Sequence, residues 1–325
     1  MSQYFDNKDS FLQPKVDQYG SHMIMTNVHK ETKKKYWNID TRFRDDYAQY
    51  SQTLSGSLIN WYTFTLPQTI NDVKNIFVNT IELPISFYNI SAAMGNNVMR
   101  INQKLLTLPD GTYTITNLKT AIQSQLSSAP ISLSTVIFDI SQNGNNIASF
   151  KNGSASSVSI NFAVKSSNTC NEVTKTSGTA TADFDKFNVK SKLGWILGFR
   201  DISYSIPNGG TTKFAESMID LNNPRYLYLI IDEFNNGNQN SFISPLPTSI
   251  INKNILAKIV MDYQHHPYGT ILPANQYNGL ILSDKRSYNG KVNLQKLKIQ
   301  LVNEYGNPVN LNGLDFSFSL EIEYE

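Results

Sequence analysis

Asp262, His265 and His266 are the residues whose types most readily suggest chemistry, because carboxylate and imidazole groups bind metal ions and transfer protons. They lie close together in the stretch "DYQHHP", which ends at Pro267. On a strand followed by a turn, however, their side chains would point to two different faces, and the sequence contains no second cluster of ligands. The sequence therefore predicts a polar loop end here and no metal site.

The other catalytic patterns are incomplete. "NGGTTK", residues 208–213, has the glycines and lysine of a phosphate-binding loop in the wrong order, so its backbone N–H groups would not line a phosphate. Adjacent carboxylates such as Asp45 and Asp46 would point apart on a strand, which makes them poor acid–base partners. The sequence has no G-x-S-x-G or H-E-x-x-H motif and only four histidines that could act as general bases. We expect no enzymatic activity, no catalytic residues and no cofactor.

A short basic region could instead bind nucleic acid. Lys33, Lys34, Lys35, Arg42 and Arg44 are interleaved with aromatic residues, and such a mixture can hold phosphates and stack on bases. The formal net charge of the whole chain is only +2, which gives no global reason to expect a polyanionic partner. We favour a solvated basic segment that precedes the first strand, and we expect no direct contact with nucleic acid.

The composition favours strands and loops. Charged residues make up 17% of the 325 residues, below the usual value of about 25%, and aromatic residues make up 11%. The single cysteine, Cys170, excludes an intrachain disulfide, and a reducing compartment fits best. The N-terminus lacks the apolar core of a signal peptide, and no uninterrupted apolar run reaches the length of about 18 residues that a membrane helix needs. We therefore expect neither secretion by a standard signal nor a membrane span.

The first 36 residues show no sustained hydrophobic period and end in the basic run. They predict an extended arm, which is either solvated or docked on a partner. Strand patterns dominate after this arm. "INWYTFTLP" (59–67) alternates apolar and polar residues, and "VKNIFVNTIELP" (73–84) is apolar on both faces, as in a strand that is covered on both sides.

One segment has a helical period. Ile115, Leu118, Ile122 and Leu126 recur at helical spacing and predict a single amphipathic helix over about 116–127, with Thr116 as its N-cap. "LGWILGF", farther along the chain, fits either a short helix or a buried turn. Many short strands, one helix and long loops together predict an all-β fold of antiparallel sheets packed as a sandwich.

The chain closes on its most regular strand pattern. In "DFSFSLEIEYE", residues 315–325, apolar and polar residues alternate, which predicts a strand with one buried face and one solvated face. We expect the apolar side chains to fill the core. Glu321 and Glu323 are expected on the outer face, where they would discourage pairing with stray strands.

Three parts of the sequence resemble capsid jelly-roll proteins of giant, nucleocytoplasmic large DNA viruses. These are "YWNIDTRFRDDY" (36–47), "FTLPQTINDVKNIFVNTIELPISFYNIS" (64–91) and the C-terminal run that begins with "LILSDKRSYNGK" (280–291). "LGWILGF" and "YLYLIIDEF" fall between them in matching order. The resemblance covers the chain from the first of these stretches to the C-terminus.

The resemblance implies an antiparallel jelly-roll β-sandwich. It would be a single barrel formed by residues 37–325, after an extended arm of residues 1–36. Insertions would lie at about 92–130, where the short helix falls, and at about 165–215. The family brings no catalytic residues with it.

The resemblance also implies a function. The chain would be a structural protein of a virion, namely the penton protein, which forms pentamers at the five-fold vertices of an icosahedral capsid. A minor capsid protein that cements the major capsid lattice from beneath is the alternative. The implied partners are further copies of this chain, as a homopentamer, together with the major and minor capsid proteins. Assembly would take place in the host cytoplasm.

Assembly contacts are expected from the basic region and from aromatic loop residues. The candidate residues are Lys33, Lys34, Lys35, Arg42, Arg44, Tyr204, Tyr268 and Tyr277, and the candidate loops lie near 204–212 and 264–278. A β-sandwich that binds carbohydrates or a receptor is an alternative of another class, because exposed tyrosines, with Tyr288 among them, can stack on sugar rings.

Overall fold

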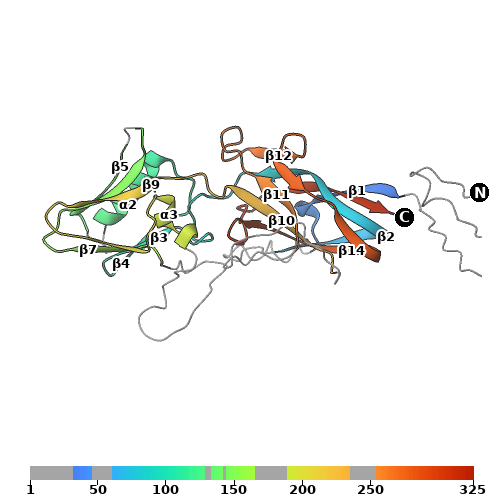
Figure 1. Ribbon diagram of the computed structural model, residues 1–325, viewed down its shortest axis with the longest axis horizontal. Helices are drawn as coiled ribbons and strands as arrows, with labels where there is room; N and C mark the ends of the chain where they lie inside the picture. Colours follow the sequence, from blue (N-terminus) through green and yellow to red (C-terminus); the bar gives the residue numbers. More distant parts are fainter. Residues whose placement is uncertain (1–31, 46–60, 129–132, 142–143, 165–188, 235–253) are drawn as a thin grey trace, which may run out of the picture.

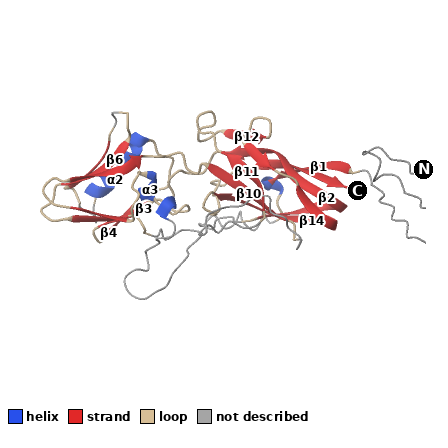
Figure 2. Cartoon of the chain, in the orientation of Figure 1, coloured by secondary structure: helices blue, strands red, loops and turns tan. Residues whose placement is uncertain are grey.

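The structure is a computed structural model. It describes residues 32–45, 61–128, 133–141, 144–164, 189–234 and 254–325. Most of the predicted arm, Cys170 and part of the predicted insertion at 165–215 lie outside these ranges. In the described residues strands dominate, helices are few and short, and the strands pair antiparallel (Figure 2). The predicted all-β sandwich class is confirmed.

The chain forms two units, each around its own hydrophobic core, and Figure 1 shows them side by side. The first unit comprises β1 (Lys33–Asp40), the 3₁₀ helix η1 (Thr41–Phe43), β2 (Tyr62–Pro84), β10 (Tyr226–Asp232), β11 (Ile255–Val260), β12 (Ile271–Asn275), β13 (Ile281–Ser283), β14 (Arg286–Asn303) and β15 (Ser317–Tyr324). These strands form one eight-stranded sheet in the order β1-β15-β2-β14-β10-β11-β13, with β12 paired to β2.

The 23-residue strand β2 is the centre of the first unit. Its C-terminal part pairs with β15 along one edge, while β14 and then β12 pair along the other edge. Val73, Ile76 and Val78 are completely buried, as expected from the apolar residues on both faces of this segment. Register shifts interrupt the pairing with β14 and β15, and such irregularities bend a strand and increase its twist. The buried side chains of this sheet pack into one core.

The second unit lies between β2 and β10 in the sequence. It comprises β3 (Val98–Ile101), β4 (Lys104–Thr107), α2 (Ile115–Ser127), β5 (Val136–Ile140), β6 (Ile147–Asn152), β7 (Val158–Asn161), η2 (Val189–Ser191), α3 (Leu193–Ile196), β8 (Ser203–Ile206) and β9 (Thr212–Met218). A sheet of order β4-β3-β7-β8 and a sheet of order β5-β6-β9 enclose its core, together with the two helices. This core draws residues from both predicted insertions and also from the segment between them. The division of the chain into an arm and one domain with insertions stays a prediction.

The predicted helix is present as α2: Leu118, Ile122 and Leu126 are buried, and Ile115, its first residue, is partly buried against the same core. Its N-cap is Thr114, whose Oγ1 accepts the N–H of Asn117 at 3.3 Å, so the prediction of Thr116 was wrong. The cap lies earlier because Thr114 is the last residue with extended backbone before the helix begins. "LGWILGF" forms the four-residue helix α3. No helix in the described residues is long and apolar enough to cross a membrane.

The closing strand is β15, and its apolar residues, such as Phe318 and Ile322, are buried as predicted. The prediction of solvated glutamates was wrong. Glu321 and Glu323 are only 4% and 7% exposed, because β15 lies between β1 and β2 rather than at an edge. The ammonium group of Lys34, on β1, lies 2.6 Å from Glu321 Oε1 and covers this face of the strand. One edge of the sheet is β1, whose first four residues, 33–36, fall within the predicted arm.

Candidate functional site

A groove of about 520 Å³ lies at one end of the first unit. The ends of β1 and β2, the turn before β12 and the turn before β15 bring its walls together. It is lined by Asp40, Arg42, Glu82, Pro84, Ile85, Gly269, Thr270, Ile271, Gly313, Leu314, Asp315, Phe316 and Ser317. We call it the end groove.

Two tight turns present apolar side chains to the end groove. In the turn before β15, Asn312 and Gly313 both have positive φ, and the Leu314 N–H donates to Leu311 O at 3.0 Å. An Asn-Gly pair favours this backbone. The turn before β12 contains Gly269, also with positive φ, and the Thr270 N–H closes it by donating to Pro267 O at 3.1 Å. Ile271 and Leu314, which follow these turns, are 62% and 52% exposed.

Phe316 is buried beside these exposed residues and lines the groove from within. Its ring makes an edge-on contact with Tyr62, with ring centroids 5.5 Å apart, and a stacked contact with Phe318. Phe43, on η1, is also exposed. The end groove therefore has a buried apolar interior, and its rim carries apolar side chains that are exposed to water in the single chain. Such a surface is typical of a protein contact.

An ion pair borders the groove. Asp40 caps η1: its Oδ1 accepts the backbone N–H of Arg42 at 2.9 Å, and the side-chain Nε of Arg42 donates to both carboxylate oxygens at 3.0 Å. These hydrogen bonds hold the pKa of the Asp40 carboxyl below its ordinary value. The two charges compensate each other, so this wall of the groove is polar without a net charge.

Arg44 holds the groove wall together rather than facing outward. It is buried, and its Nη1 donates to Thr41 O at 2.7 Å and to Asp315 Oδ1 at 2.8 Å, an ion pair between residues 271 positions apart. Thr41 Oγ1 donates to the same carboxylate oxygen at 2.7 Å and accepts the Phe316 N–H at 3.0 Å. This network fixes η1 against the start of β15.

The three lysines of the basic region lie at the other end of β1. All are exposed on the edge strand. The hydrogen bond from Lys34 to Glu321 raises the pKa of the lysine above its ordinary value. The ammonium group of Lys35 lies 5.1 Å from the centre of the Tyr324 ring. The structure thus separates Lys33, Lys34 and Lys35 from Arg42 by the length of β1.

The predicted tyrosines have different surroundings. Tyr204 packs against Phe199 at the rim of the second core, and its hydroxyl donates to Glu216 Oε2 at 2.8 Å. Burial raises the pKa of Tyr204 to about 12. Tyr288 was wrongly predicted to be exposed: it is buried and donates to Glu233 Oε1 at 2.7 Å, because a phenol inside a core needs a polar partner.

Tyr268 and Tyr277 flank β12 and are exposed. Tyr268 stacks on Tyr88 with ring centroids 6.0 Å apart, next to the Gly269 that lines the end groove. Tyr277 lies in the turn after β12 and is 98% exposed.

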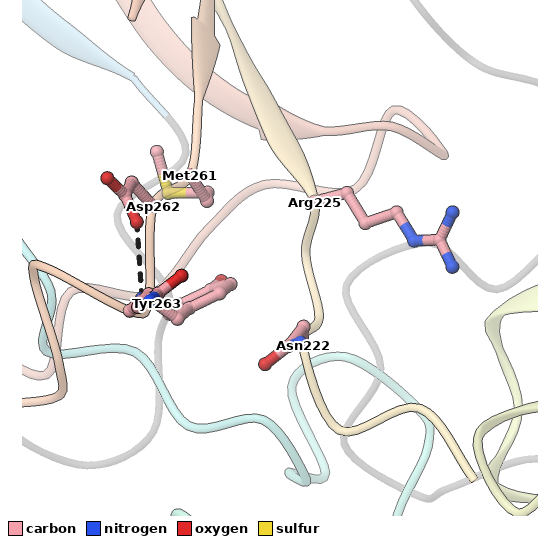
Figure 3. A pocket seen from close by; sticks show the side chains of 6 residues that line it. Asn222, Arg225, Met261, Asp262 and Tyr263 are labelled. Carbon is pink, nitrogen blue, oxygen red and sulfur yellow. Dashed lines mark hydrogen bonds between the residues drawn. The ribbon is translucent and has the colours of Figure 1, made fainter. Parts of the chain in front are cut away.

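A second pocket, of about 350 Å³, contains the residue that first suggested chemistry (Figure 3). It is lined by Asn222, Arg225, Met261, Asp262, Tyr263 and Gln264. Asp262 Oδ2 lies 2.7 Å from His265 Nδ1, and this hydrogen bond lowers the pKa of the carboxyl. Among the described residues, no group of three or more histidine, cysteine, aspartate or glutamate side chains could hold a metal ion.

Of the exposed apolar residues at the end groove, Ile271 falls within the predicted contact loop near 264–278, whereas Leu314 was not among the sequence candidates. Ile271 and Leu314 each follow closely on a turn glycine, and an isolated apolar residue in that position was the available signal. That signal is weak, because turn residues of this kind are also buried in many proteins. Their exposure follows from how the two turns meet in space.

Comparisons with known proteins find similar chains among solved structures. No protein-family model and no curated protein matches this chain. Among solved structures, it is similar to the crystal structure of the selenomethionine-labelled mavirus penton protein, with 11% sequence identity and a TM-score of 0.41. The match covers 91% of this chain and 100% of the other. A TM-score of this size does not establish a shared fold.

Proposed function

We propose that this chain is a structural protein of a viral capsid that works by binding copies of itself and other shell proteins. The end groove carries this proposal. It exposes apolar side chains of Ile271 and Leu314 on a unit whose core is already complete. Covering such side chains gains roughly 25 cal/mol for each Å² of apolar surface removed from water. A fixed groove with an exposed apolar rim suits a protein whose role is contact.

The finer proposal is the penton, which occupies five-fold vertices as a homopentamer. The sequence stretches that resemble giant-virus capsid proteins support it, as does the antiparallel sandwich that they imply. In a closed ring, each subunit uses one surface to bind a different surface of the next subunit. Major and minor capsid proteins would surround the ring in the virion. A minor capsid protein beneath the lattice is the alternative, and it would need no five-membered ring.

The oligomeric state tests this proposal. We expect native mass spectrometry of the purified full-length chain to show a species with the mass of five chains, in a proportion that rises with protein concentration. A ring would support the penton. A chain that binds neither itself nor shell proteins at any concentration would contradict a capsid role. Binding to major capsid protein without self-association would favour the minor capsid alternative.

A further inference from the structure

We propose that the turn carrying Tyr277 in one copy occupies the end groove of a second copy. This inference rests on the proposed function, since it names the contact that would join neighbouring subunits. The turn comprises residues 275–279, between β12 and β13. Tyr277 is the most exposed of the large apolar and aromatic residues that the structure describes.

The turn has a fixed shape before it binds. Asn275 Oδ1 accepts the N–H groups of Tyr277 and Asn278, each at 2.9 Å. The Asn278 side chain donates to Pro273 O at 2.7 Å and accepts the N–H of Leu280 at 3.1 Å. A turn held in this way loses little conformational freedom on binding, which favours affinity. Its sequence, Asn-Gln-Tyr-Asn-Gly, carries no charge that would have to leave water.

The end groove offers what a tyrosine needs. The exposed side chains of Ile271 and Leu314 supply apolar surface for the ring, with the buried Phe316 behind them, and the volume of about 520 Å³ exceeds that of one aromatic side chain. The polar tip of a tyrosine needs a hydrogen-bond partner when it is covered. Glu82 lines the groove and is exposed; its Oε2 accepts a hydrogen bond from Ser317 Oγ at 2.7 Å, and its carboxylate can accept further bonds.

The positions of turn and groove exclude contact within one copy. They lie at opposite ends of β12, and Figure 1 shows a loop on each side of this strand. Five strand residues span roughly 16 Å. Contact between two different surfaces of identical chains is heterologous, and it closes into a ring when the rotation between copies allows. One tyrosine buries only about 150–250 Å², against about 800 Å² per partner in a stable interface. The turn is therefore the anchor of a larger contact.

Two substitutions test the two sides of this contact one at a time. Tyr277→Ser removes the anchor and leaves the groove intact, while Leu314→Asp places a charge in the groove and leaves the turn intact. Each residue is exposed, so we expect both variants to melt like the wild type. Each alone should weaken self-association about 30-fold or more, as expected for an interface hot spot. Matched controls at exposed residues elsewhere, Phe214→Ser and Leu105→Asp, should assemble normally.

The mixture of the two variants is the decisive test. Combined in equal amounts, with one of them isotope-labelled, they can form one intact contact: the turn of the Leu314→Asp chain in the groove of the Tyr277→Ser chain. Native mass spectrometry should therefore show a 1:1 heterodimer and no larger ring. If the Leu314→Asp chain melts early, Ile271→Asp replaces it as the blocked groove.

The outcomes that overturn this inference differ from those that overturn the proposed function. A wild-type chain that forms rings while both variants also form them would overturn the inference alone. A mixture of the two variants that stays monomeric, or that forms full rings, would also overturn the inference alone. A wild-type chain that never self-associates would overturn both the pentamer and this contact.

Discussion

At the scale of single residues, the first unit is held by a buried polar network. Arg286 is 1% exposed, and its Nη1 lies 2.7 Å from Glu233 Oε2 and 2.9 Å from Ile231 O. Its Nη2 donates to Asn254 O at 2.9 Å, and Tyr288 donates to the other oxygen of Glu233. Because every charge is paired and hydrogen-bonded, the network is tolerable inside the core, but removing one partner leaves a buried charge.

We predict that Arg286→Ala lowers the free energy of unfolding by about 3–5 kcal/mol, because Glu233 then loses its cationic partner in a dry site. Urea unfolding followed by circular dichroism measures the change. Arg42→Ala is the matched control: its ion pair with Asp40 is exposed on the arginine side, and exposed pairs contribute about 0–1 kcal/mol. Equal effects of the two substitutions would contradict this account of the network.

Glu304 is another buried carboxyl, directly after β14. The Arg225 N–H donates to its Oε1 at 3.4 Å, and among the described residues no donor lies within hydrogen-bonding distance of its Oε2. Burial raises the pKa of Glu304 above its ordinary value. The folded chain therefore binds this proton more readily than the unfolded chain does. The site destabilises the fold at a pH above the folded-state pKa, and this penalty is relieved as the pH falls through that value.

We predict that Glu304→Gln raises the free energy of unfolding at about pH 7, by roughly 1 kcal/mol, because a neutral amide replaces a poorly satisfied carboxylate. The gain should shrink as the pH falls from this value, because the raised pKa of Glu304 lets the folded wild-type chain take up the proton before the unfolded chain does. Urea unfolding of both chains at a series of falling pH values gives the comparison. If the stabilisation by Glu304→Gln instead increases as the pH falls, the predicted direction of the pH dependence is wrong.

At the scale of elements, a close approach between α3 and β9 requires a glycine. Gly198 follows α3 with a φ of +93°, and a Cβ at this position would lie 2.0 Å from Ser217 O. The Ser217 N–H also donates to Gly198 O at 3.1 Å, so the two backbones are joined. Gly144 has a similar φ of +87°, but an added Cβ would meet no atom within 4 Å.

We predict that Gly198→Ala is far more destabilising than Gly144→Ala. Both substitutions cost about 1–2 kcal/mol through the left-handed backbone. Only the first also forces α3 away from β9, which should add several kcal/mol or prevent folding of the second unit. Thermal unfolding of both variants makes the comparison. Similar melting temperatures would mean that the contact between α3 and β9 is looser than described.

Some of these elements could be predicted from the local sequence, and others could not. The alternation at Phe318 and Ile322 and the helical period of α2 depend on neighbouring residues, and both predictions are confirmed. The burial of Glu321 depends on which strand pairs beside β15, and β1 lies nearly 300 positions earlier in the chain. Local pattern carries no information about such a neighbour, so the solvated face was predicted wrongly.

At the scale of the whole molecule, the candidate site is formed by segments that are far apart in the sequence and close together in the fold. The end groove needs the ends of β1 and β2, the turn before β12 and the turn before β15 to meet. Arg44 and Asp315 show the distance involved, since 271 positions separate them. The sequence could propose Arg42 and Tyr268 as contact residues, and that role stays a prediction. It could not reveal the groove between them, nor that the chain between β2 and β10 builds a second core.

The central claim is that this chain joins copies of itself in a capsid. A density map of purified particles that contain the chain, averaged about the five-fold axes, tests it most directly. We predict that the two-unit outline of this chain fits the vertex five times, with the turn after β12 of each copy against the end groove of the next. Density for the chain only between vertices, or absent from the shell, would contradict the account.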